Sequence, residues 1–126
     1  MLNHKRTLIA AVIFAALGLA AAATAPTRTL KGYVTDTYCG VNRVNRAPTA
    51  ACTVQCVKSQ HAKYAFFNFA DHKVYVLNPQ SEAAKYAGRT VIVKGAIAGR
   101  EHFTTMKGPG DGAVITASSI TPVAKP

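Results

Sequence analysis

The stretch NPQSEAAKYAG, residues 78–88, decides the fold, because it places a short helix between two segments that are rich in strand-forming residues. Asn78 is a favourable N-cap, Pro79 suits the first helical turn, and Gly88 is typical of a helix end. The sequence therefore predicts a helix over residues 79–87, with a strand on each side of it.

The segments around this helix predict five strands, which are residues 30–38, 63–69, 73–77, 89–98 and 113–123. A loop at 39–48 and a helix at 48–60, capped by Thr49, separate the first two strands, and a long loop at 99–112 separates the last two. Five strands with a helix between the third and fourth have the connectivity of an OB-fold. The expected fold is thus mainly β, a five-stranded OB-fold-like partly open barrel with two short helices; a small curled sheet or sandwich is the alternative.

Two loops of such a barrel are candidates for the functional end. In an OB-fold the loops that join strands one to two and four to five lie on the binding side. Here the first of them, 39–63, holds all three cysteines, and the second, 99–112, holds His102, Met106 and Lys107. We expect these side chains to converge at one end of the barrel.

The N-terminus has the pattern of a secretory signal peptide. A basic start with Lys5 and Arg6 precedes about twelve apolar residues and then small residues, whereas a transmembrane helix needs about 20 apolar residues. A cleaved signal is therefore expected, and an uncleaved anchor is the alternative. The predicted organisation is a signal peptide over 1–23, a flexible leader over 24–29, a single OB-like domain over 30–122 and a tail over 123–126. The mature protein is expected to be periplasmic or secreted, with no transmembrane helix after cleavage.

The chain is strongly basic, with 15 Lys and Arg against five Asp and Glu and a formal net charge of +10. Loss of Lys5 and Arg6 with the signal peptide leaves about +8, a charge that favours contact with anionic surfaces. An anionic component of the cell envelope is therefore a candidate partner, and export argues against nucleic acid. The basic residues are scattered along the chain, which favours the alternative of an evenly charged surface.

The three cysteines, Cys39, Cys52 and Cys56, pose a pairing problem, because thiols pair in oxidising compartments and an odd number cannot all pair within one chain. Residues one helical turn apart have Cβ atoms about 5–6 Å apart, whereas a disulfide needs about 3.5–4.5 Å. Cys39 is therefore expected to pair with Cys52 or Cys56. Such a bridge closes a loop of 13 to 17 residues and stabilises the fold by about 3 kcal/mol.

Metal binding and thiol chemistry are the competing interpretations of these cysteines. Three thiolates with one histidine suit zinc, and Cys, His and Met suit copper(I), so copper or zinc is the alternative cofactor, with His102 or Met106 as an additional ligand. His61 lies about 180° from Cys52 around the helix, which argues against His61 as a ligand. The third interpretation is a thiol–disulfide exchange factor centred on Cys52, whose place in the first helical turn favours a thiolate.

No set of catalytic residues is evident. The five carboxylates are scattered, and no phosphate-binding, zinc-protease or serine-hydrolase motif occurs, so no enzymatic activity is expected. Tyr64 and Tyr75, together with Lys107, are candidates for a binding surface, although alternation along a strand sends half of the aromatic side chains into the core. The expected function is a disulfide-stapled binding domain of unidentified ligand, acting through loops 39–63 and 99–112.

One further pattern runs along most of the chain, and it consists of Gly32-Tyr-Val-Thr-Asp36-Thr-Tyr-Cys39-Gly40, Cys52-x-x-x-Cys56-Val57-Lys58, Ala62-Lys63-Tyr64, Val74-Tyr75-x-Leu77, and Ala87-Gly88 before Val91-x-Val93-x-Gly95. From about Leu30 to Ile120 the chain resembles a family of small exported bacterial proteins, common in acidobacteria, that is classed as a domain of unknown function. The resemblance implies an exported, OB-like domain and no known activity. Members carry a His shortly after the Cys-Gly pair, where this chain has Asn42, Arg43 and Val44, and this departure argues against a His-assisted metal site.

Overall fold

The computed structural model describes residues 24–43 and 45–124, so the predicted signal peptide and the last two residues of the predicted tail lie outside the described residues. The elements in chain order are β1 (Thr27–Asp36), a 3-10 turn (Gly40–Asn42), α1 (Ala50–Ser59), β2 (Tyr64–Asn68), β3 (Val74–Asn78), α2 (Gln80–Ala84), β4 (Thr90–Thr105) and β5 (Gly108–Pro122).

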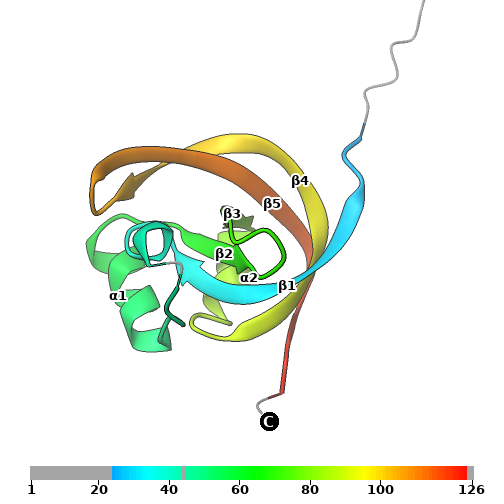
Figure 1. Cartoon of the computed structure of the whole chain (residues 1–126), viewed down its shortest axis with the longest axis horizontal. Helices are drawn as coiled ribbons and strands as arrows, with labels where there is room; N and C mark the ends of the chain where they lie inside the picture. Colours follow the sequence, from blue (N-terminus) through cyan, green and yellow to red (C-terminus); the bar gives the residue numbers. More distant parts are fainter. Residues whose placement is uncertain (1–23, 44, 125–126) are drawn as a thin grey trace, which may run out of the picture.

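The five strands close into a ring in the order β1-β2-β3-β5-β4, and β4 pairs back onto β1 (Figure 1). Only β3 and β5 run parallel; the other neighbours in the ring are antiparallel. The ring is uneven, because β4 and β5 are three times as long as β2 and β3. This arrangement confirms the predicted OB-fold-like barrel with two short helices and excludes the sandwich.

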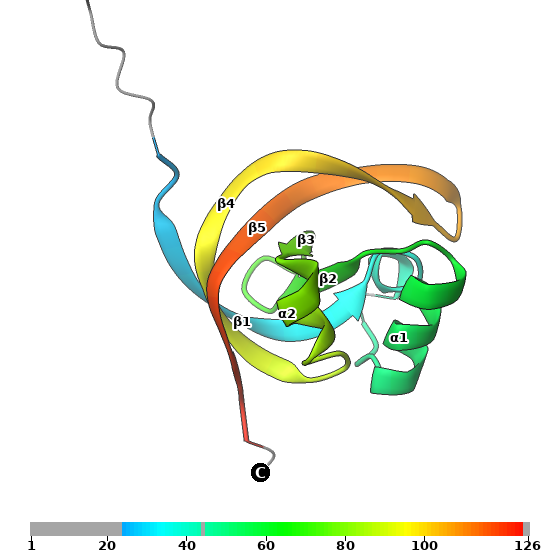
Figure 2. The ribbon, with the colours of Figure 1, turned by 180° about the vertical axis from the view of Figure 1, so that it is seen from behind.

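The interior of the ring is filled by side chains from every strand. The largest fully buried apolar side chains of this core are those of Val34 of β1, Phe66 of β2, Leu77 of β3, Val91 and Val93 of β4, and Ile115 of β5. The helix α2 packs its buried Ala83 against the same core, and Figure 2 shows α2 in front of β2 and β3. Because the interior is packed, any binding site of this domain lies on its outside or in its loops.

The prediction of a long loop at 99–112 is wrong. β4 and β5 continue through this segment as a paired hairpin, with Thr105 opposite Gly108 at its tip. A Cβ atom at Gly110 would lie 2.9 Å from Cε2 of Phe103, its partner on β4, so the glycine leaves room for the aromatic ring. Glycines that suggest a turn in the sequence therefore serve here as the surface on which Phe103 packs.

The start of the domain also differs from the prediction. β1 begins at Thr27, which pairs with Ala96, so half of the predicted leader 24–29 already belongs to the barrel. In the part of the chain that is described, no helix combines the length and the apolar character that crossing a membrane requires.

The second helix is shorter than predicted, and its cap is different. Asn78 does not cap it, because its side-chain Nδ2 donates a hydrogen bond of 2.8 Å to Oε1 of Glu101 on β4. Pro79 occupies the N-cap position, and the regular helix ends at Ala84. Gly88, with a φ of 73°, lies beyond the helix at the turn into β4.

Candidate functional site

A buried carboxylate at the end of β1 shapes the loop that carries the first cysteine. Asp36 is 2 % exposed, and its Oδ1 accepts hydrogen bonds from the N–H groups of Tyr38 at 2.8 Å and Cys39 at 2.7 Å. Asp side chains stabilise a turn in this way. A Cβ atom at Gly40 would lie 2.6 Å from Oγ1 of Thr35, so the close return of the loop onto β1 requires glycine. Cys39 is thereby fixed beside the end of the strand.

Helix α1 brings the other two cysteines to the same place. Thr49 caps the helix as predicted, because its Oγ1 accepts a hydrogen bond of 3.1 Å from the N–H of Cys52. Val54 and Val57 pack against the barrel core, as the helical periodicity indicates. This docking leaves Cys52 exposed in the first turn and Cys56 nearly buried one turn later.

The three sulfur atoms form one group, which we call the cysteine cluster (Cys39, Cys52 and Cys56). Their Sγ atoms all lie within 4.8 Å of one another, and those of Cys39 and Cys56 are 3.3 Å apart. All three cysteines are unbonded thiols in the structure. Cys39 therefore faces both helix cysteines at once.

The cluster contains one thiol that is difficult to ionise. Burial raises the pKa of Cys56 far above its ordinary value, and the hydrogen bond with Cys39 and the negative charge of Asp36 raise this pKa further. Cys56 therefore keeps its proton at neutral pH unless a cation displaces it. Such a thiol suits a structural or metal-ligand role better than that of an attacking nucleophile.

The spacing of the cluster fits a metal ion held by three thiolates. Zinc binds sulfur at about 2.3 Å in tetrahedral geometry, so two sulfurs on one ion are about 3.8 Å apart. Sulfur atoms that already lie within 4.8 Å of one another need only small side-chain rotations to reach this spacing. Among the described residues no histidine or carboxylate belongs to the group, so the chain supplies three such ligands and leaves a fourth position open.

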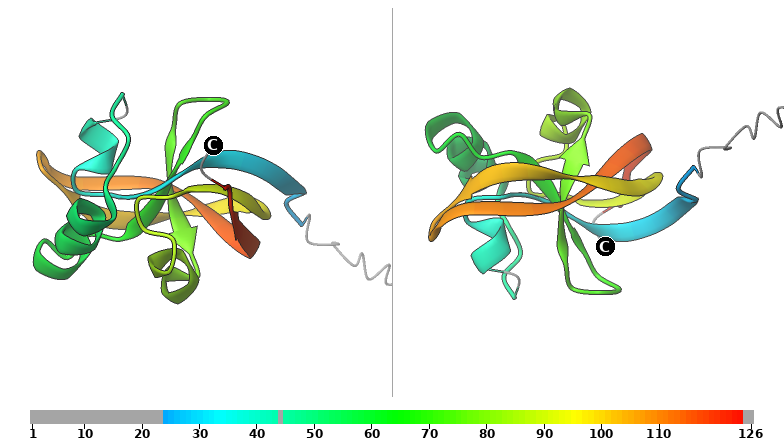
Figure 3. Two further views of the ribbon diagram at one scale, coloured as in Figure 1. Left: turned by 90° about the horizontal axis from the view of Figure 1, so that it is seen from below. Right: turned by 90° about the horizontal axis from the view of Figure 1, so that it is seen from above.

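The tip of the β4–β5 hairpin approaches the loop that carries Cys39, but the predicted histidine ligand does not reach the cluster. The N–H of Met106 donates a hydrogen bond of 3.2 Å to the carbonyl oxygen of Tyr38, and Figure 3 shows the β4–β5 tip at the same end as α1. His102 is exposed on β4, and His61 is exposed after α1; neither belongs to the cluster. The Met106 side chain is 49 % exposed at the hairpin turn.

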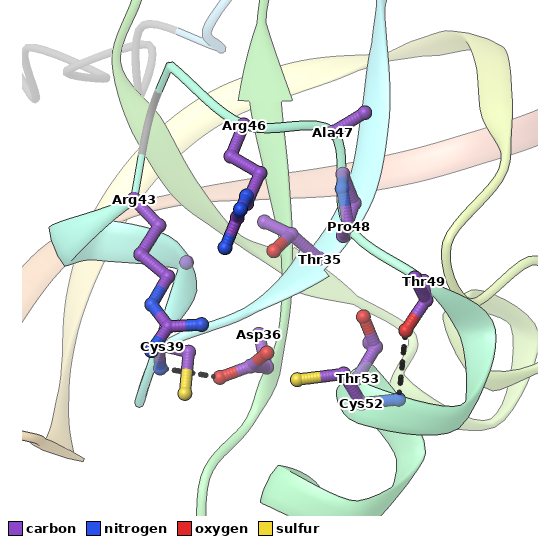
Figure 4. Close-up of a pocket in the computed structure, with 11 residues that line it drawn as sticks. Thr35, Asp36, Cys39, Arg43, Arg46, Ala47, Pro48, Thr49, Cys52 and Thr53 are labelled. Carbon is purple, nitrogen blue, oxygen red and sulfur yellow. Dashed lines mark hydrogen bonds between the residues drawn. The ribbon is translucent and has the colours of Figure 1, made fainter.

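A pocket of about 290 Å³ opens beside the cluster (Figure 4). Cys39 and Cys52 line it, and the side chains of Arg43 and Arg46 extend from the loop toward it. Thr53 also lines the pocket; it is fully buried, and its Oγ1 has no hydrogen-bond partner among the described residues. Arg43, Arg46 and Thr53 were not predicted as site residues; two arginines within a cysteine-bearing loop were the available signal.

The predicted aromatic binding surface is wrong for both tyrosines. Tyr64 and Tyr75 are each 8 % exposed and belong to the buried core, whereas Lys107 is exposed at the hairpin turn. Alternation along the strands explains the difference, because neighbouring aromatic side chains point to opposite faces. The aromatic rings that pack together and remain half-buried are those of Tyr33, Phe67 and Phe69.

Comparison with known proteins identifies no relative of this chain. The resemblance to a family of exported bacterial proteins therefore stays a prediction. No protein-family model, curated protein or solved structure matches the chain.

Proposed function

We propose that this domain binds a soft metal ion, copper(I) or zinc, through the thiolates of Cys39, Cys52 and Cys56, and that it does so as an exported protein. The observation that carries the proposal is the mutual proximity of three Sγ atoms, all within 4.8 Å, contributed by two separate elements. Thiolate is the ligand that both ions prefer. Copper(I) is satisfied by three thiolates, whereas zinc requires one more ligand.

The surroundings of the cluster support reversible binding. A thiol must lose its proton to bind a metal, so the raised pKa of Cys56 makes binding compete with protons. Cys52 is exposed and lies at the rim of the pocket, which gives an ion a route of entry. Acidification is therefore expected to release the ion.

A disulfide between Cys39 and Cys56 is the second candidate, and the 3.3 Å between their sulfur atoms supports it. Loss of two hydrogen atoms to an oxidant would join these sulfurs, close a loop of 17 residues and leave Cys52 free. In this alternative the domain is a binding module stabilised by a disulfide, and the cluster has a structural role.

Native mass spectrometry of the mature protein, purified from the periplasm without reductant or chelator, separates the two candidates. Metal binding predicts the mass of one added copper or zinc ion, which is lost at low pH, and three thiols that alkylate afterwards. A protein two mass units light, with a single alkylating thiol, would overturn the metal proposal and establish the disulfide.

Cys52→Ser sharpens this test, because Cys52 is exposed and its replacement should leave the fold intact. The metal proposal predicts that this variant loses the ion. The disulfide alternative predicts that it keeps the Cys39–Cys56 bridge and the stability of the parent protein. Ser59→Ala, at the exposed end of α1, is a control that should retain the ion.

A further inference from the structure

We propose that the pocket beside the cysteine cluster is a binding site for a small oxyanion, a phosphate or carboxylate group, which Arg43, Arg46 and the hydroxyl of Thr53 recognise. The proposal goes beyond metal binding and does not require a metal. Three independent features of the pocket support it: uncompensated positive charge, a buried hydroxyl without a partner, and a suitable size.

The first feature is the absence of acidic partners for the two arginines. Among the described residues no ion pair involves Arg43 or Arg46. Each of the five side-chain carboxylates of the chain has another partner: Asp36 the backbone N–H groups of Tyr38 and Cys39, Asp71 Tyr75, Glu82 Lys85, Glu101 Lys63 and Asp111 Arg100. Guanidinium groups recognise carboxylate and phosphate through paired hydrogen bonds. Figure 4 shows both arginine side chains reaching from the loop toward the pocket.

The second feature is the hydroxyl of Thr53. Thr53 is 0 % exposed, and the structure gives its Oγ1 no hydrogen bond to any described residue. A buried polar group without a partner costs about 1–3 kcal/mol, so an occupant of the pocket that accepts a hydrogen bond would remove this cost. Figure 4 shows the Thr53 hydroxyl directed into the pocket, between Thr35 and Thr49.

The third feature is the shape of the pocket. Its volume of about 290 Å³ is near the lower end of the range for small-molecule sites, about 300–1,000 Å³. The site therefore takes a small anion or metabolite and not the chain of a polymer. Thr49 places the N-terminus of α1 at the same pocket, and a helix N-terminus favours negative charge.

Asp36 also lines the pocket, and its charge opposes an anion. Its Oδ1 is already bound by the N–H groups of Tyr38 and Cys39, and two guanidinium charges face this single carboxylate. The net charge around the pocket thus remains positive while the cysteines are protonated.

The test is an NMR titration of the ¹⁵N-labelled mature protein, kept reduced and metal-free with a chelator. Inorganic phosphate and succinate are added in separate titrations, which distinguishes the two kinds of oxyanion. We expect saturable shifts of the amide signals of residues 39–46 and 49–53 with at least one of them. The absence of saturable shifts with both anions would overturn the proposal.

Two sets of variants test the residues. Arg43→Gln with Arg46→Gln should weaken affinity by about tenfold or more, and Thr53→Val by about fivefold, the effect of one hydrogen bond. The matched control is Arg28→Gln with Lys94→Gln, which removes the same charge from exposed positions of β1 and β4 and should change affinity by less than about twofold. Equal weakening by the two double variants would show non-specific attraction and refute the site. Because no metal is present, the result is independent of the outcome for the cysteine cluster.

Discussion

Asp36 and Cys39 are joined by a hydrogen bond of 2.7 Å from the N–H of the cysteine to Oδ1 of the carboxylate. The same oxygen accepts the N–H of Tyr38, so one buried atom sets the path by which the chain leaves β1. The position of the first cysteine therefore depends on a residue that is not a member of the cluster.

Asp36→Ala should lower the free energy of unfolding by about 3 kcal/mol, because two hydrogen bonds to a charged, buried acceptor are lost. Asp36→Asn, whose amide oxygen can accept the same bonds without the charge, should lower it less. Urea unfolding of the reduced, metal-free protein measures both. A stability of Asp36→Ala equal to that of the wild type would contradict the role assigned to this carboxylate.

Two buried threonines allow a matched comparison. Oγ1 of Thr37 accepts a hydrogen bond of 3.0 Å from the N–H of Lys63, whereas Oγ1 of Thr53 has no partner among the described residues. Thr37→Val should therefore lower the free energy of unfolding by about 1–2 kcal/mol, and Thr53→Val should leave it unchanged or raise it by up to about 1 kcal/mol. Thermal and urea unfolding give the comparison; similar losses in both variants would show that the Thr53 hydroxyl has a partner in solution.

Phe103 is expected to stabilise the end of the β4–β5 hairpin. A Cβ atom at Gly112 would lie 3.1 Å from Cε1 of Phe103, which shows how closely the ring covers β5. Phe103→Ala should lower the free energy of unfolding by about 1–2 kcal/mol and speed amide hydrogen exchange over residues 100–112. Met106→Ala, at the exposed turn, is the control and should change neither. Unchanged exchange in Phe103→Ala would mean that the backbone pairing alone maintains the hairpin.

The lowered pKa of Glu101 predicts that the stability of the protein depends on pH. Hydrogen bonds from Lys63 and Asn78 lower the pKa of Glu101 below its ordinary value of 4.5. A carboxyl group with a lowered pKa in the folded state contributes stability above its unfolded pKa, and loses it as the pH falls through its folded pKa. Melting temperatures of the wild type and Glu101→Gln should therefore differ at pH 7 and converge as the pH falls below 4.5. A constant difference down to pH 2 would show that the charge of Glu101 is not the cause.

Local patterns in the sequence were sufficient to predict the order of strands and helices along the chain. The helix after β3 and the Thr49 cap follow from short-range preferences, and the structure contains both. The prediction of a loop over residues 99–112 was wrong because the hairpin there depends on contacts between residues distant in sequence. Glycine usually indicates a turn, but the room that Gly110 leaves for Phe103 is a contact across two strands, which no local pattern reports.

The candidate site was likewise predictable only in part from the sequence. Helical periodicity predicts that Cys52 and Cys56 share a face, and the place of Cys39 after the first strand brings it to the same loop. The contributions of Arg43 and Arg46 depend on the path of the loop between them and α1, and that path is not determined by residue preferences. The burial of Thr53 likewise depends on how α1 docks on the barrel.

The backbone hydrogen bonds that close the ring join the five strands, and none of the three cysteines lies in a strand. Small zinc-dependent domains unfold without their ion because the ion substitutes for a core. Here the core is complete without one, since buried side chains from all five strands already fill the barrel. An ion in the cysteine cluster would link α1 to the end of β1, and the stability of the barrel core does not depend on this link. Because Val54 and Val57 already pack α1 against the core, emptying the site would leave both the helix and the fold in place, and reversible binding of an ion requires this.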